Sequence, residues 1–94
     1  MQYFVYILYS KKLDRYYTGT TDDVAVRLSQ HNTDHYPGSF TTKGIPWEIY
    51  LSISCPSSEA AFKLEVFIKK MKSKTFILKL KEHPEIIQDI ISKF

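Results

Sequence analysis

The stretch that most constrains the fold of this chain is residues 3–31, YFVYILYSKKLDRYYTGTTDDVAVRLSQH. Its first part, 3–10, is aromatic or branched almost throughout, which predicts a β-strand. Apolar and polar residues do not alternate cleanly there, so we expect burial on both faces and a central place in the sheet. The polar residues 11–14 predict a hairpin turn, and 15–20 predict a second strand antiparallel to the first.

A helix follows the hairpin and ends at about residue 31 or 32, and its candidate caps are Thr20, Thr21 and Asp22. At about 100° per residue, one stripe of this helix carries Val24, Arg27, Leu28 and His31. An ordinary amphipathic helix would have apolar side chains at all four positions. We therefore expect Arg27 and His31 on or beside the face that packs on the sheet. The alternative is that Arg27 extends to the rim and His31 is an ordinary, partly buried histidine.

The segment 33–46 contains two prolines and two glycines, which predicts a loop. Its length suggests a functional role, with Lys43 as a candidate contact for nucleic acid, and a solvated loop is the alternative. Along 47–54 apolar and polar residues alternate, which predicts a half-buried strand. The apolar face of this strand is expected to carry Trp47, Ile49, Leu51 and Ile53.

A second helix is predicted at 59–71, with Ser58 as its cap. Its buried stripe is expected to contain Ala61, Leu64, Ile68 and Met71, widened by Phe62 and Phe67. Glu65 falls inside or beside this apolar stripe, about 40° from Ala61 around the helix. A carboxylate there needs a cation, hydrogen-bond donors or a metal ion as its partner. An ion pair with Arg27 or Lys69 would meet that need without any catalytic role.

The segment 69–81 is the most basic in the chain, and a short helix capped by Ser73 is predicted in it, with an inward stripe of Phe76, Ile77 and Leu80. The lysines form either a solvated face or a patch that contacts phosphates, for which the candidates are Lys69, Lys70, Lys72 and Lys74. A last helix, about 84–93, opens with Pro84 at its first position. Its apolar stripe packs on the body of the domain or forms a homodimer surface.

Length and composition narrow the class of protein. The 94 residues suit a single domain, 1–94, and the net charge of +3 permits nucleic-acid binding without requiring it. The single Cys55 excludes an internal disulfide and no Cys/His spacing suits zinc, so we expect a cytoplasmic location. The apolar run at the start is too short to cross a bilayer, so no membrane association is expected.

Five short elements occur in a fixed order along the chain: Val5-Tyr6-Ile7-Leu8, Tyr17-Thr18-Gly19, Arg27-Leu28, His31-Asn32 and Glu65. This order resembles the GIY-YIG nuclease superfamily over about residues 3–81. The similarity is greatest to its small stand-alone members, which are like the N-terminal domain of excision-repair nucleases. Val5 stands where the family has the first glycine of GIY, and Thr18 replaces the isoleucine of YIG.

The resemblance implies hydrolysis of DNA phosphodiester bonds with one Mg²⁺, for which Mn²⁺ can substitute. Glu65 would hold this ion, and Arg27 would bind phosphate oxygens through its guanidinium. Tyr6 or Tyr17 would take a proton from the attacking water. We favour Tyr6 as this base, with Tyr17 positioning water or phosphate.

Two further residues receive roles from the resemblance. His31, one turn after Arg27, would assist the proton transfer or the binding of phosphate. Gly19 would let the backbone approach the phosphate without a side chain in the way.

Together, these patterns predict an α/β (α+β) domain with a three-stranded antiparallel sheet flanked by helices. The expected order is β-β-α-β-α-α, with an extra C-terminal helix. The first functional hypothesis is a DNA endonuclease, structure-specific and linked to repair or recombination, in which Glu65 meets both tyrosines and Arg27 in one hollow. One alternative is a catalytically weak or inactive nucleic-acid-binding module of the same fold. The other is a protein-interaction domain that dimerises through the last helix.

Overall fold

The computed structural model describes residues 2–33 and 40–94 and confirms the predicted order of strands and helices. One element was not expected, because the short helix α2 lies in the segment predicted to be a loop, part of which falls outside the described residues. In chain order the elements are β1 (Tyr3–Ser10), β2 (Arg15–Thr21), α1 (Val24–Asn32), α2 (Phe40–Lys43), β3 (Trp47–Cys55), α3 (Ser58–Met71), α4 (Lys74–Glu82) and α5 (Pro84–Ile91).

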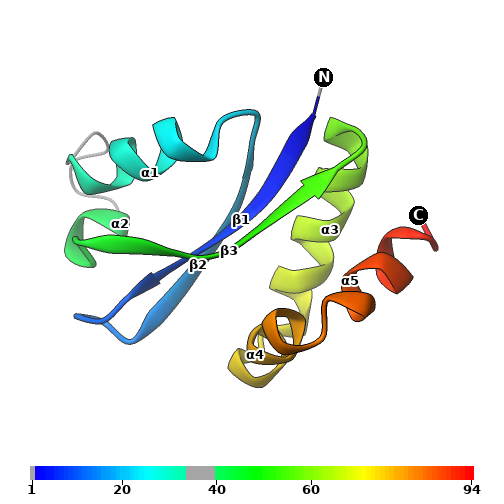
Figure 1. The fold of residues 1–94 in the computed structure, drawn as a ribbon. Coiled ribbons are helices and arrows are strands. Elements are labelled where there is room, and N and C mark those ends of the chain that lie inside the picture. The colour runs from blue at the N-terminus through cyan, green and yellow to red at the C-terminus, as the bar shows by residue number, and fades with distance from the viewer. Residues whose placement is uncertain (1, 34–39) are drawn as a thin grey trace.

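The sheet has the strand order β2-β1-β3, with both pairs antiparallel, so β1 is the central strand as predicted. Helix α1 lies on one face of the sheet, and α3, α4 and α5 lie on the other (Figure 1). Two small cores result, one on each face. Tyr6, Leu8 and Trp47 are buried on the α1 face, and Val5 and Ile7 on the α3 face. The predicted division of β1 between the two faces is therefore confirmed.

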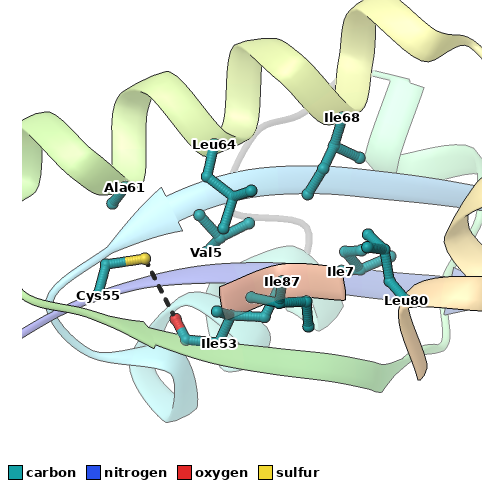
Figure 2. Close-up of a cluster of buried hydrophobic side chains, with 9 residues drawn as sticks. All are labelled: Val5, Ile7, Ile53, Cys55, Ala61, Leu64, Ile68, Leu80 and Ile87. Carbon is teal, nitrogen blue, oxygen red and sulfur yellow. Dashed lines mark hydrogen bonds between the residues drawn. The ribbon is translucent and has the colours of Figure 1, made fainter. Parts of the chain in front are cut away.

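The larger core lies between the sheet and the helices of the C-terminal half. Figure 2 shows Ala61, Leu64 and Ile68 of α3 pointing toward the strands, as their spacing predicted. Ile87 of α5 reaches the same core, and three further isoleucines of this helix pack against it. The apolar stripe of the last helix thus packs on the body of the domain, and a homodimer through it stays a prediction.

The predicted alternation of β3 was wrong. The register with β1 passes from Ile7 opposite Leu51 to Leu8 opposite Ile49, so Tyr50 is an extra residue at a bulge. The extra residue reverses the faces along β3. Trp47 consequently packs in the core on the α1 face, Ile53 packs in the core on the α3 face, and Ile49 is 44% exposed.

Three apolar side chains that were expected to be buried on α3 are exposed, namely Phe62, Phe67 and Met71. Phe62 lies about 100° around the helix from Ala61 and therefore points away from the sheet. Phe67 packs its ring on Phe76 of α4, with 5.9 Å between ring centroids, instead of entering the core. Met71 is in the last turn, where the chain leaves for α4.

Two of the three predicted helix caps were displaced by one residue or more. The side chain of Asp23 caps α1, since the hydroxyl of Thr21 is engaged with the backbone of Asp23. Ser57, not Ser58, caps α3, and Ser73 caps α4 as predicted. In both displaced cases neighbouring residues are all able to cap, so the sequence pattern does not distinguish them. None of the described helices is long and apolar enough to cross a membrane.

Candidate active site

Tyr6, Tyr17 and His31 meet on the α1 face of the sheet, and we call them the tyrosine–histidine cluster. β1 places Tyr6 there, and β2 places Tyr17 on the same face because it pairs with Leu8. The oxygen Oη of Tyr6 lies 3.1 Å from Nε2 of His31. The rings of Tyr17 and His31 are in contact, with 4.9 Å between centroids. Two strands and one helix thus bring three predicted site residues together.

The cluster faces solvent through Tyr17. Tyr6 is 2% exposed and His31 is 4% exposed, whereas Tyr17 is half-buried. Trp47 packs beside Tyr17, with 6.4 Å between ring centroids. Tyr17 is therefore the most exposed member of the cluster, and Tyr6 and His31 are almost fully buried.

The charge state of His31 follows from its surroundings. Burial, and after it the positive charge of Arg27, lowers the pKa of His31 from its ordinary value of 6.5. The imidazole is therefore uncharged at neutral pH, and one of its nitrogens can accept a hydrogen bond. When Nε2 is that nitrogen, the hydroxyl of Tyr6 donates to it.

Arg27 lies one turn before His31 on α1 and is half-buried. Both side chains lie on the stripe predicted to face the sheet. Arg27 lies near enough for its positive charge to lower the pKa of His31, after burial, the larger cause. The structure thus provides a guanidinium near the imidazole, the group best suited to bind phosphate oxygens in pairs.

Glu65 belongs to α3, which covers the opposite face of the sheet from Tyr6 and Tyr17 (Figure 1). Its side chain is 15% exposed and forms an ion pair with Lys69, with 3.1 Å between Oε2 and Nζ. Among the described residues Glu65 has no other hydrogen bond or ion pair. The structure therefore does not bring Glu65 into contact with the tyrosine–histidine cluster.

The side of α3 that carries Glu65 nevertheless faces β2. Lys69 lies about 40° from Glu65 around the helix, and it lines a pocket together with Tyr17 and Thr18 of β2. β2 is an edge strand, so its free side is open to groups from both faces of the sheet. Tyr17 thus lies on the edge strand, and Lys69, the ion-pair partner of Glu65, lines the pocket beside it.

Gly19 lies directly across from Tyr6 in the register of β1 and β2. A Cβ atom at this position would lie 2.6 Å from Oη and 2.8 Å from Cζ of Tyr6, closer than real contacts allow. The absence of a side chain at Gly19 thus makes room for the phenol of Tyr6. An approach of the Gly19 backbone to phosphate stays a prediction.

The predicted nucleic-acid contacts divide into two groups. Lys69, Lys72 and Lys74 line the pocket at the edge of β2. Lys70 is exposed on α3 outside this pocket, and Lys43 is exposed at the end of α2. Only the first group is gathered in one place.

Two residues important to this region were missed. Arg15 lines the same pocket as the three lysines, yet only the folded hairpin brings it there, and nothing in the sequence marks it. Asn32 holds the backbone of Trp47 through two hydrogen bonds. Its Nδ2 donates to the carbonyl of Trp47 at 2.8 Å, and the backbone N–H of Trp47 donates to Oδ1 of Asn32 at 2.6 Å. The sequence pattern named Asn32 only as part of the His31-Asn32 element and gave it no role of its own.

The described residues include no group of three or more His, Cys, Asp and Glu side chains placed to hold a metal ion. A single carboxylate such as Glu65 nonetheless suits Mg²⁺. This ion keeps several of its waters and takes further ligands from the phosphates of the substrate. The donor set therefore fits the ion implied by the resemblance.

Comparison with known proteins adds two findings. The family model described as the GIY-YIG catalytic domain matches residues 2–79, which include the tyrosine–histidine cluster, Arg27 and Glu65. The chain is also similar to the solution NMR structure of the UPF0213 protein BH0048 from Bacillus halodurans. The two share 30% sequence identity with a TM-score of 0.54, over 90% of each chain. No curated protein matches the chain.

Proposed function

This chain belongs to the GIY-YIG catalytic-domain family and so has a nuclease-type function, and on that premise we propose that it is a Mg²⁺-dependent DNA endonuclease. The observation that carries the proposal is the buried hydrogen bond between Tyr6 and His31, with the half-buried ring of Tyr17 in contact with His31. The proposal includes structure-specific cleavage of branched, damaged or duplex DNA in repair or recombination, in the cytoplasm.

Proton transfer is the part assigned to the cluster. An ordinary tyrosine has a pKa of about 10 and is a poor base at neutral pH. A neutral His31 removes this difficulty, because Tyr6 can accept a proton from water while it passes its own hydroxyl proton to Nε2. The hydroxide formed attacks phosphorus, and His31 carries the proton away. Tyr17, at the mouth of the cluster, positions the water or the phosphate.

We assign the stabilisation of the negative charge that develops on the phosphate to Arg27 and to the metal ion. Arg27 binds non-bridging phosphate oxygens, where the growing negative charge resides. Glu65 would hold Mg²⁺ together with waters and the substrate itself. An ion bound there would neutralise the negative charge on the leaving oxygen.

The test is cleavage of plasmid, branched and single-stranded DNA with and without Mg²⁺. We expect cleavage that needs the ion and falls at least about 100-fold in Glu65→Gln and in Arg27→Ala. Glu59→Gln is the matched control. It makes the same change on α3, where Glu59 is exposed and paired with Lys63. Undiminished cleavage by the first two variants would exclude this site.

The position of Glu65 favours a second candidate function. Its carboxylate already has Lys69 as a partner and does not contact the tyrosine–histidine cluster. A nucleic-acid-binding module that keeps the fold without cleaving would look the same. It predicts DNA binding that falls with salt but is indifferent to Mg²⁺ and to Glu65→Gln.

A further inference from the structure

The hollow at the free edge of β2 has a volume of about 380 Å³ and is built from two parts of the chain that are far apart in the sequence. Residues 14–18 of the hairpin form one wall. The last turns of α3 and the first turn of α4 form the other. We call it the β2-edge pocket. Tyr17 lines this pocket, while its ring belongs to the tyrosine–histidine cluster on the α1 face, so the two sites share one residue of the edge strand.

Positive charge dominates the lining of the β2-edge pocket. Its cationic side chains are Arg15, Lys69, Lys72 and Lys74, and Asp14 is the only acidic residue that lines it among those described. Two of the cations already have carboxylate partners, Lys74 with Asp14 and Lys69 with Glu65. Arg15 and Lys72 form no ion pair with any described residue. The pocket therefore holds two positive charges that are not engaged in an ion pair with a described residue.

Lys72 occupies an unusual backbone position. It ends α3 in the left-handed region, with φ 47° and ψ 40°, where glycine is the favoured residue. A side chain other than that of Gly, Asn or Asp is costly there. A lysine at this position keeps a positive charge in the pocket at the expense of backbone strain, as occurs at functional sites.

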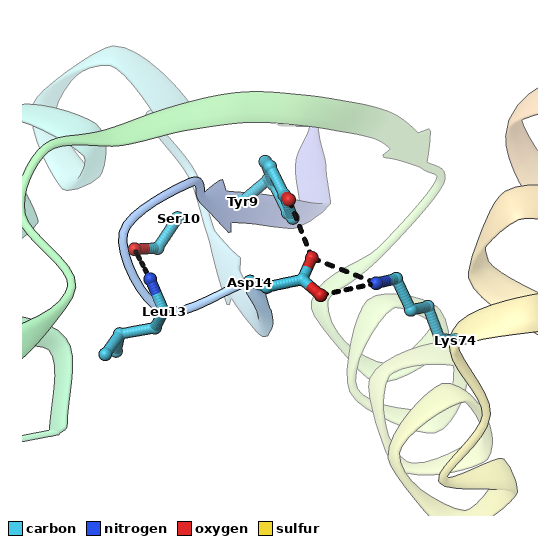
Figure 3. A network of polar contacts seen from close by, with 5 residues as sticks. All are labelled: Tyr9, Ser10, Leu13, Asp14 and Lys74. Atoms are coloured by element: carbon cyan, nitrogen blue, oxygen red, sulfur yellow. Dashed lines mark hydrogen bonds and ion pairs between the residues drawn. The ribbon is translucent and has the colours of Figure 1, made fainter.

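The ion pair between Lys74 and Asp14 joins the hairpin wall of the pocket to its helical wall. Figure 3 shows Asp14 between Tyr9 and Lys74, with 2.9 and 3.0 Å from Nζ to the two carboxylate oxygens. Both charged side chains are more than half exposed, so the pair contributes little to stability. An anion of higher charge density can thus displace Asp14 and recruit Lys74 without unfolding the region.

We propose that the β2-edge pocket binds a backbone phosphate of the nucleic-acid strand that crosses Tyr17, with Arg15 and Lys72 as its ligands. This inference rests on the proposed function for the identity of the anion. Hydroxyls of Thr18 and Ser73 in the lining provide further hydrogen-bond donors to phosphate oxygens. Arg15 and Lys72 are positioning residues that fix the strand, and the chemistry stays with the cluster.

The test is DNA binding in the presence of EDTA, which prevents metal-dependent cleavage, followed by fluorescence anisotropy over a range of salt. Arg15→Gln and Lys72→Gln should each weaken binding about fivefold to tenfold at ~0.1 M salt. Each should also reduce the slope of log affinity against log salt by about 1. Lys63→Gln is the control, since it removes the same charge from α3 outside the pocket.

A second variant separates binding from folding. Lys72→Gly places the favoured residue in the left-handed position, so the melting temperature should rise while DNA binding falls as in Lys72→Gln. If both pocket variants bind DNA as Lys63→Gln does, the pocket is not a phosphate site. A polyglutamate peptide that competes as well as DNA would also overturn the proposal, in favour of an acidic protein partner.

The outcomes also distinguish this inference from the proposed function. Loss of binding in the pocket variants of a protein that never cleaves DNA supports the pocket and refutes the nuclease. Cleavage by the wild-type protein, together with unchanged DNA binding by the pocket variants, refutes the pocket alone.

Discussion

Gly19 and Tyr6 depend on each other at the scale of single residues. The phenol of Tyr6 lies over Gly19 and reaches His31 only because no side chain is in the way. Tyr6 is also buried in the core of the α1 face and cannot turn outward to avoid a clash. The geometry of the tyrosine–histidine cluster thus depends on the lack of a side chain at Gly19 on the neighbouring strand.

Gly19→Ala should destabilise the protein by about 1–3 kcal/mol, the usual cost of overpacking a well-filled core. The new Cβ would meet Oη of Tyr6 at 2.6 Å. The same substitution in a Tyr6→Phe background should cost less, because the nearest atom is then absent. Denaturant unfolding of the four proteins in this double-mutant cycle measures the difference. Equal costs in the two backgrounds would contradict the contact.

His31 should make the stability depend on pH. Because burial and Arg27 lower its pKa in the folded state, the unfolded chain takes up the proton first as the pH falls. The contribution of neutral His31 to the free energy of unfolding is fully present above about pH 6.5. It is lost as the pH drops through 6.5 toward the lowered pKa of the folded state. His31→Gln should remove this part of the pH dependence of Tm. The exposed His83→Gln should keep it, and the same slope in both variants would argue against the assignment.

At the scale of elements, Asn32 joins the end of α1 to the start of β3. Its side-chain amide satisfies both the N–H and the carbonyl of Trp47, which form the beginning of the strand. Trp47 in turn is buried beside Tyr17. The segment between α1 and β3 is fixed at a second point, where the hydroxyl of Ser10 donates to the carbonyl of Gly44 at 2.7 Å.

Asn32→Ala should cost about 2 kcal/mol, because it leaves two partly buried backbone groups of Trp47 without partners. In a domain of this size that corresponds to a fall in Tm of about 10 °C. Asn32→Asp should lie between wild type and Asn32→Ala, since it keeps the acceptor and loses the donor. Thermal unfolding measures all three proteins, with the exposed neighbour Thr33→Ala as control. Equal falls in Tm in Asn32→Ala and Thr33→Ala would contradict a stabilising role of the two hydrogen bonds from Asn32 to Trp47.

The sequence predicted elements better than their details, for physical reasons. The apolar run 3–10 and the stripe Ala61, Leu64 and Ile68 follow directly from the periods of strand and helix, and both were confirmed. The bulge at Tyr50 depends on pairing with β1 and leaves no local signal. The exposure of Phe62 likewise depends on which part of α3 meets the sheet, which propensity does not encode.

At the scale of the whole molecule, the sheet separates the candidate catalytic residues into two groups, one on each face. Tyr6, Tyr17 and His31 were predicted as site residues, and strand alternation places both tyrosines on the face of the sheet where His31 of α1 meets them. Glu65 was expected in the same hollow, but its helix α3 covers the opposite face of the sheet. Which face a helix covers depends on the topology of the chain, and a helical wheel gives no information about topology. The shared edge strand β2 is the place where the two groups can cooperate.

If a metal ion and a bound DNA strand join these two groups, paramagnetic Mn²⁺ should report it. With an uncleavable DNA analogue present, we expect Mn²⁺ to broaden the NMR signals of Glu65 and Tyr17 together, since Tyr17 and the ion-pair partner of Glu65, Lys69, line the same pocket. Without DNA the broadening should be weaker, because one protein carboxylate holds the ion loosely. Glu65→Gln should abolish it and Glu59→Gln should not. Broadening that reaches Glu65 but leaves Tyr17 and His31 sharp would place the ion too far from the cluster for a shared reaction.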